Sequence, residues 1–194
     1  MMLKDIIGQL LEDRRNEAYT SKGIGPIFQV HENARILIIG QAPGKKTEEA
    51  GIPFSDKSGD TLRDWMGVTK EEFYAPEIAI LPMDFYYPGK GKSGDLPPRS
   101  FIAAEYHKKM LSLMPHISLT VLMGSYATKQ YLGKTMKKNL TETVKAYDEY
   151  LPRYFPIVHS SPLNFRWQGK NPWFKEDVVP AFRSRVQGIL KEKL

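Results

Sequence analysis

The chain has 194 residues, 41% of them hydrophobic and 26% charged, which suits one globular domain over residues 1–194 and excludes wholesale disorder. It contains no cysteine, so disulfides, zinc–thiolate sites and iron–sulfur clusters are excluded, because each requires cysteine sulfur. The net charge of +6 favours a polyanion such as nucleic acid as a partner, and an inert basic surface is the alternative interpretation.

The amphipathic pattern of residues 1–17 predicts an N-terminal helix that packs on this domain. The apolar side chains of one face are Ile6, Ile7, Leu10 and Leu11. The segment carries acidic residues and lacks a long apolar centre, so it does not fit a signal peptide. No apolar run of the chain approaches the roughly 20 residues that a membrane-spanning helix needs. We therefore expect a cytoplasmic protein that makes no membrane contact.

Strands and helices are predicted to alternate along the rest of the chain. Short aliphatic runs predict buried strands at residues 35–39, 77–83, 118–123 and 155–158. Helices are predicted at residues 61–66, 69–74, 101–113, 126–132, 139–147 and 174–190. Their candidate caps are Ser58 or Asp60, Thr69, Ser100, and Asn139 or Thr141. Loops are expected at residues 19–34, 45–52, 86–100 and 159–167. This alternation predicts an α/β domain with a parallel sheet and helices on both faces.

Four of the loops follow predicted strands and are candidates for a binding site. They cover residues 40–44, 83–100, 124–125 and 159–162. Ligands bind at the carboxyl ends of the strands in such sheets, and parallel strands bring these ends to one edge. We therefore expect the four loops to gather at that edge.

The first of these loops is a tight turn after the aliphatic run ILII, and its residues are Gly40, Gln41, Ala42, Pro43 and Gly44. Glycines let a backbone approach a ligand closely, and exposed N–H groups at a turn can hold an anion or a carbonyl oxygen. The turn lacks the Gly-Lys-Ser/Thr of a phosphate loop and the spacing of a dinucleotide site. Taken alone, it is also compatible with a purely structural role.

Phe54 lies in a loop rich in glycine, serine and proline, where little local core is available to it. Its ring could stack on a nucleobase, an interaction worth roughly 1–3 kcal/mol per base. The alternative is a ring that folds back onto the core of the domain.

The glycine-rich loop of residues 86–99 carries Lys90, Lys92 and Arg99. Cations on such a loop suit contacts to phosphates that involve no sequence readout. A solvated loop without a partner is the alternative.

His159 begins the loop HSSPLNFRW, which follows the last predicted strand. An imidazole at this place can donate a hydrogen bond to charge that develops on a leaving group. Leu163 and Phe165 lie near Arg166, and apolar wedges beside cations suit a loop that enters a DNA duplex. The alternative is a capping loop whose aromatic side chains are buried, and we favour that interpretation for Trp167 and Trp173. The histidines at positions 31, 107 and 116 are interpreted as ordinary surface or packed residues.

Five segments of the chain together resemble the uracil-DNA glycosylase superfamily, from about residue 35 to residue 190. In chain order they are ILIIGQAPG, GIPFSDKSGDTLRDWMG, FYYPGKGKSGDLPPR, LMGSYA and HSSPLNFRW. Each segment is a weak signal alone, whereas their order and spacing are specific. The resemblance implies a single three-layer α/β/α domain with a four-stranded, mainly parallel sheet.

The resemblance also implies an enzyme that flips a target nucleotide out of the DNA stack and into a pocket. The pocket floor would consist of Gly40, Gln41, Ala42, Pro43 and Gly44. Phe54 would stack on the base, and His159 would donate a hydrogen bond to it as negative charge develops. Leu163 would wedge into the duplex. Further DNA contacts are expected from Ser58, Lys90, Lys92, Ser125, Ser160, Ser161 and Arg166.

Two departures from the family pattern concern the acid and the base-reading amide. The best-known members carry Asp or Asn, which positions the attacking water, where this chain has Ala42. Other branches also carry Ala and rely on the adjacent residue, often Glu, whereas this chain has Gln41, which can hold a water but is a poor base. No Asn follows the second strand. We expect Asp84 there to bind the substrate by accepting hydrogen bonds from an amino group, and the alternative is that it lies outside the pocket. The acids that could supplement Gln41 are Asp56, Asp60 and Asp84.

The predicted function is therefore a DNA glycosylase that removes uracil or another deaminated or damaged base, with His159 and Gln41 as catalytic residues. We expect a monomer that acts on DNA with a modified base and needs no metal and no cofactor. One alternative is a DNA-binding module of the same fold that has lost catalysis. Another is a hydrolase of free nucleosides or nucleotides.

Overall fold

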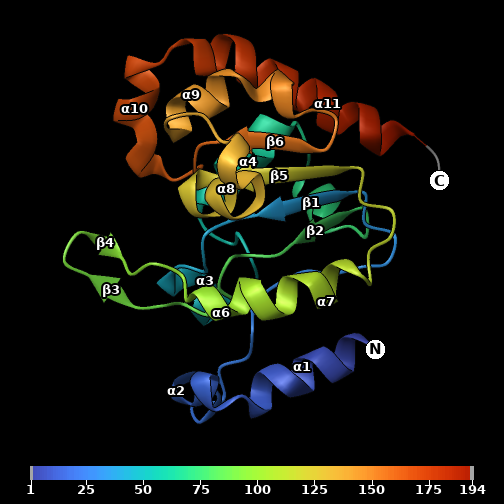
Figure 1. Cartoon of the computed structure of the whole chain (residues 1–194), viewed down its shortest axis with the longest axis vertical. Coiled ribbons are helices and arrows are strands. Elements are labelled where there is room, and N and C mark those ends of the chain that lie inside the picture. The colour runs from blue at the N-terminus through green and yellow to red at the C-terminus, as the bar shows by residue number, and fades with distance from the viewer. Residues whose placement is uncertain (1, 193–194) are drawn as a thin grey trace.

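A parallel sheet forms the centre of the protein, whose computed structural model describes residues 2–192. The strand order is β2-β1-β5-β6 (Figure 1). The four strands are β1 (Ile36–Ile39), β2 (Ile78–Ile80), β5 (Leu119–Met123) and β6 (Tyr154–Ile157). Nearly all of their residues are buried, as expected of continuous aliphatic runs covered on both faces. The predicted parallel sheet is therefore confirmed.

Helices cover both faces of the sheet. Ile36 and Ile38 of β1 belong to one hydrophobic cluster, whereas Leu37 and Ile39 belong to the other, because successive residues of a strand face opposite sides. Packed on the first face are α4 (Lys57–Met66), α5 (Lys70–Phe73), α9 (Leu140–Lys145) and α11 (Val179–Lys191). Packed on the second are α1 (Leu3–Glu12), α6 (Ser100–Ile102), α7 (Lys108–Leu111) and α8 (Gly124–Leu132). Figure 1 shows these layers, and the three-layer α/β/α architecture is as predicted.

Several helix ends follow the predicted capping residues. The Thr69 hydroxyl accepts a hydrogen bond from the Glu72 N–H at 3.1 Å, and the Glu72 carboxylate accepts one from the Thr69 N–H at 2.7 Å. The Asn139 side chain accepts from the Glu142 N–H at 2.9 Å. Gly67 ends α4 with a φ of 69°, a conformation that glycine adopts without strain. The predicted caps Thr69 and Asn139 are therefore confirmed.

The N-terminal segment differs from the single helix predicted over residues 1–17. The Asp13 carboxylate accepts a hydrogen bond from the Arg15 N–H at 2.9 Å, so α1 ends before it and a 3₁₀ turn follows at Arg14–Asn16. Helix α2 (Glu17–Thr20) comes next. Ile6 and Leu10 of α1 are buried in the hydrophobic cluster of the second face.

The capping residues predicted for two helices were wrong. Asp56, rather than Ser58 or Asp60, caps α4, because its Oδ1 accepts from the N–H groups of Ser58 and Gly59 at 3.1 and 3.3 Å. Ser100 is the first residue of α6 instead of its cap. A π-helical turn (Ala103–His107) joins α6 to α7 within the predicted helix.

Three segments predicted as loops contain regular structure. Residues 45–52 include α3 (Lys45–Ala50), and the segment after His159 includes a 3₁₀ turn (Pro162–Asn164) and α10 (Phe165–Lys170). The glycine-rich segment contains a hairpin of β3 (Lys90–Gly91) and β4 (Gly94–Asp95), which projects from the body of the protein in Figure 1. Within residues 2–192, no helix is long and apolar enough to cross a membrane.

Candidate active site

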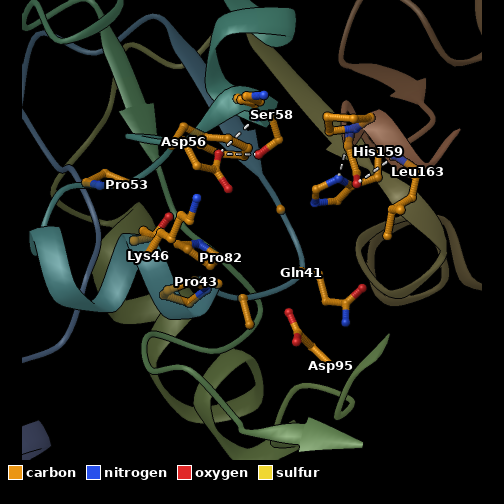
Figure 2. Close-up of a pocket in the computed structure, with 18 of the residues that line it drawn as sticks. Gln41, Pro43, Lys46, Pro53, Asp56, Ser58, Pro82, Asp95, His159 and Leu163 are labelled. Atoms are coloured by element: carbon orange, nitrogen blue, oxygen red, sulfur yellow. Dashed lines mark hydrogen bonds between the residues drawn. The ribbon is translucent and has the colours of Figure 1, made fainter. Parts of the chain in front are cut away.

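A cavity of about 470 Å³ lies at the carboxyl edge of the sheet. Its walls come from the turn after β1, the segment before α4, Pro82 after β2, the hairpin, and the loop after β6 (Figure 2). Three of the four predicted loops therefore meet there. The fourth does not, because Gly124 and Ser125 are absent from the cavity lining.

The turn of residues 40–44 forms one wall and is held by the chain that leaves β2. The carbonyl of Gly40 accepts a hydrogen bond from the Met83 N–H at 2.9 Å, and that of Gln41 accepts from the Asp84 N–H at 3.1 Å. The Gln41 side chain is half-buried and lines the cavity. Two backbone hydrogen bonds thus hold the turn in place, and its polar side chain faces the space that a ligand would occupy.

The Phe54 ring lines the cavity next to Gly40. Phe54 has a φ of +54°, in the left-handed region that non-glycine residues rarely adopt. Its carbonyl accepts a hydrogen bond from Arg63 Nη1 at 3.2 Å, and its ring packs edge-on against Phe73 with centroids 6.1 Å apart. A Cβ added to Gly40 would lie 3.3 Å from the ring. The ring therefore joins the core, as one interpretation predicted, and because it also borders the cavity, stacking on a nucleobase stays a prediction.

His159 is held in one tautomer by its own loop. Its Nδ1 accepts a hydrogen bond from the Ser161 N–H at 3.1 Å, so the neutral ring carries its hydrogen on Nε2. Burial lowers the pKa of His159 below its ordinary value, and the Asp56 carboxylate partly opposes that shift. Figure 2 shows the ring directed into the cavity. The imidazole is thus a neutral hydrogen-bond donor near pH 7.

Asp56 and Ser58 join the start of α4 to the His159 loop. Asp56 lines the cavity, while its Oδ1 accepts from the Ser58 hydroxyl at 2.5 Å in addition to its capping bonds. The Ser160 hydroxyl donates to the Ser58 carbonyl at 2.7 Å and is fully buried. The prediction that Ser160 contacts DNA is therefore wrong, because this side chain closes the wall from inside. Ser58 is 8% exposed and lines the cavity.

Asp84, predicted to bind substrate, lies away from the cavity in an ion pair. Its carboxylate accepts from Arg99 Nε and Nη2, each at 2.8 Å, and from the N–H groups of Tyr86 and Arg99 at 3.1 and 3.0 Å. Asp84 has no exposed surface. The prediction that Asp84 binds the substrate is therefore wrong, whereas the alternative that it lies outside the pocket is confirmed. Arg99 is a structural partner instead of a free cation on a solvated loop.

Some of the remaining predicted DNA contacts line the cavity, and others lie on exposed surface. Ser161 and Leu163 line it, and Leu163 is 83% exposed. Lys90 and Lys92 are exposed on the hairpin, and Arg166 is exposed on α10. Trp167 packs against the core and donates from its Nε1 to Thr141 at 2.9 Å, which agrees with the capping-loop interpretation.

Several lining residues were not singled out from the sequence, among them Lys46, Pro82, Asp95 and Asn164. Asn164 donates to the His159 carbonyl at 2.6 Å, so it supports the loop. Asp95 lies within the predicted loop of residues 83–100, but residue spacing does not reveal which side chain of that loop enters the cavity. Among residues 2–192, no group of three or more His, Asp or Glu side chains is arranged to hold a metal ion.

Comparison with known proteins relates this site to a family. The model of the uracil DNA glycosylase superfamily matches residues 27–183, which include the whole sheet and every lining segment of the cavity. The solution NMR structure of a proposed uracil DNA glycosylase from Methanosarcina acetivorans is similar over 82% of this chain and 98% of that one, with 16% identity and a TM-score of 0.45. The family match confirms the resemblance inferred from the five sequence segments. This chain belongs to the uracil DNA glycosylase superfamily.

Proposed function

We propose that this protein is a DNA glycosylase that hydrolyses the N-glycosidic bond of uracil or another deaminated base in DNA. The observation that carries the proposal is the His159 imidazole, a neutral Nε2–H donor directed into a cavity next to the turn of residues 40–44. A donor placed where charge develops on a departing base lowers the barrier to its departure.

The cavity offers the other elements that base removal needs. The flipped base would lie against the Phe54 ring, near the backbone of the turn. As the bond between the sugar C1′ and the base breaks, the electron pair moves onto the base, whose carbonyl oxygen accepts the hydrogen bond from His159. Gln41 Oε1 can accept a hydrogen bond from the water that attacks C1′. The cavity thus separates base recognition from water placement.

The surface around the cavity suits a DNA duplex. Leu163 and Phe165 are 83% and 65% exposed, and both follow the His159 loop. Exposed apolar side chains at the rim of a base pocket can fill the space that the flipped base leaves. Lys90, Lys92 and Arg166 supply nearby positive charge for phosphates. These features favour DNA over a free nucleoside as substrate.

One observation favours a second candidate function, a DNA-binding protein without catalysis. Neither Gln41 nor Ala42 can accept a proton from water, so the turn itself supplies no general base. Such a protein would bind a flipped base and leave the glycosidic bond intact.

Cleavage of defined oligonucleotides would test the proposal. The panel contains uracil, hypoxanthine, xanthine and thymine, with uracil and thymine opposite guanine, and alkali reveals abasic sites. We expect single-turnover cleavage of at least one deaminated base, slowed about 10²–10³-fold in His159→Ala. His116→Ala is the matched control, because His116 is an exposed histidine outside the cavity lining, and this variant should cleave at the parent rate.

Two outcomes would contradict the proposal. Salt-sensitive DNA binding without any cleavage would support the second candidate. Turnover of free nucleosides with no action on oligonucleotides would indicate a nucleoside hydrolase instead.

A further inference from the structure

We infer that Asp95, on the β3–β4 hairpin, is the general base of the reaction and accepts a proton from the attacking water. The inference rests on the proposed glycosylase function. Asp95 lies outside the turn of residues 40–44, on a hairpin that the tertiary fold brings to the cavity.

The chemistry requires a proton acceptor that the turn lacks. The oxygen of water forms a bond to C1′ while the bond from C1′ to the base breaks, and the base leaves with the electron pair. The water must then release one proton. The Gln41 amide can orient the water but does not take the proton at neutral pH, and the Ala42 methyl group can do neither.

Two carboxylates line the cavity among the residues that the structure describes, Asp56 and Asp95. Asp56 caps α4, because its Oδ1 accepts hydrogen bonds from two N–H groups and the hydroxyl at the start of that helix. Its Oδ2, like that of Asp95, has no donor among residues 2–192, so position separates the two acids. Figure 2 shows Asp56 next to Ser58, across the cavity from Gln41. Asp60 is also unsuitable, because it pairs with Arg63 at 2.6 Å and lies outside this cavity.

Asp95 has a carboxylate oxygen without a hydrogen-bond donor, and it lies where a general base is needed. Its Oδ1 accepts one hydrogen bond, from the Tyr87 hydroxyl at 3.2 Å, and within residues 2–192 no donor contacts its Oδ2. Figure 2 shows the carboxylate directed into the cavity on the same side as the Gln41 amide. A water held by Gln41 Oε1 could therefore pass its proton to Asp95.

The placement also keeps the two catalytic groups apart. His159 lies on the loop after β6, whereas Asp95 lies on the hairpin, so the donor to the base and the acceptor from water come from different walls. Tyr87 contacts Asp95, and Lys90 lies opposite it in the hairpin. The other titratable side chains of the cavity lining are Lys46, Asp56, Lys57 and His159.

The test compares single-turnover cleavage by the full-length parent with that of Asp95→Asn, on whichever oligonucleotide the parent cleaves. Asparagine keeps the shape of the side chain and an acceptor for Tyr87, so the hairpin should fold. We expect a rate about 100-fold lower, with affinity for the uncleaved oligonucleotide within about three-fold. The matched control is Glu49→Gln, which removes an exposed carboxylate of α3 outside the cavity lining and should not change the rate.

Two further variants make the test specific for a proton acceptor. Gln41→Glu, combined with Asp95→Asn, returns a carboxylate to the same side of the cavity and should recover at least ten-fold of the lost rate. Asp56→Asn keeps the cap of α4 and should slow cleavage less than Asp95→Asn does.

The outcomes separate this inference from the function on which it rests. A parent that cleaves no substrate overturns both. A parent that cleaves while Asp95→Asn retains its rate, or loses rate and DNA affinity in parallel, overturns the role of Asp95 alone. A larger loss in Asp56→Asn than in Asp95→Asn would assign the base to Asp56 and likewise overturn it.

Discussion

Two polar regions lie near the carboxyl end of β2, and each contains an acidic residue and a histidine. The inner cluster consists of Asp84, Arg99 and His107, and the cavity region contains Asp95 and His159. In the inner cluster every polar atom of the acid and the histidine has a partner: His107 Nδ1 contacts the Tyr131 hydroxyl at 2.7 Å and Nε2 contacts the Pro82 carbonyl at 2.9 Å. In the cavity region one atom of each side chain has no such partner among residues 2–192.

The difference teaches that residue type does not decide which group can react. Carboxylates and imidazoles stabilise the fold where neighbouring groups use all their hydrogen-bonding capacity, and they can act on a ligand where part of it is left over. The two regions also cooperate, because His107 holds the carbonyl of Pro82, and Pro82 is a wall of the cavity. Each of the following measurements changes one side of this comparison.

Asp84→Ala should have the largest effect, on stability. The substitution leaves Arg99 facing a buried site without its counterion, which costs about 3–5 kcal/mol when one member of a buried pair is lost. Urea unfolding followed by circular dichroism measures the change. Asp64→Ala is the control, because the Asp64 side chain is 77% exposed, and it should cost under about 0.5 kcal/mol. A cost below about 1 kcal/mol for Asp84→Ala would show that the inner cluster is not structural.

Acidification should weaken the fold through His107. Burial lowers the pKa of His107 to about 4, whereas an unfolded histidine has a pKa near its ordinary value of 6.5. The unfolded state therefore binds more protons between these values, so the contribution of His107 is complete above about pH 6.5 and lost as pH falls toward about 4. The full loss is about 3 kcal/mol, and about 2 kcal/mol of it falls between pH 7 and 5.

The free energy of unfolding, measured in urea at pH 7 and pH 5, checks this expectation against His107→Gln. The variant should be weaker at pH 7 and should lose about 2 kcal/mol less than the parent on acidification. The pKa of His159 is also lowered by burial, so some dependence of the same sign should remain. Equal pH dependence in parent and variant would refute the role assigned to His107.

Gly40→Ala should have the smallest effect of the three substitutions, and it should change the cleavage rate rather than the stability of the fold. The added methyl group would lie 3.3 Å from the Phe54 ring, whose left-handed backbone and bond to Arg63 limit its movement. We expect about ten-fold slower single-turnover cleavage, equivalent to about 1.4 kcal/mol, with little change in melting temperature. Gly8→Ala, where nothing lies within 4 Å of the added group, controls for a simple glycine effect. An unchanged rate would mean that the ring position does not matter for cleavage.

The predictions made from sequence succeeded where local chemistry determines structure. Aliphatic runs gave the strands, and Thr69 and Asn139 were readable as caps because their partners lie three residues ahead. Helix α3 escaped because Thr47 is its one buried residue, and α10 escaped because it buries none, so neither shows an apolar period. At the start of α4 the sequence offers several capping residues, and Asp56 is the one that the backbone presents to the free N–H groups.

The site was predictable in part for the same reason. The turn of residues 40–44, Phe54 and His159 each stand directly after a strand or before a helix, and the fold brings them together. Asp84 was misassigned because its partner Arg99 lies 15 residues away on a loop with no periodic pattern. Asp95 was missed because the hairpin's approach to the cavity is a tertiary arrangement.

The Arg99 side chain has a practical consequence for experiments in solution. It donates to Asn16 Oδ1 at 2.9 Å and to the Arg15 carbonyl at 3.0 Å. Hydrogen bonds of Arg99 therefore link the hairpin segment to the N-terminal segment, 83 positions earlier in the chain. Guanidinium ions have the same donor geometry as this side chain and compete with it for Asp84, whereas urea carries no charge. Urea and guanidinium chloride should therefore give different results. Low concentrations of guanidinium chloride should detach the hairpin, and with it Asp95, from the rest of the protein before the sheet unfolds.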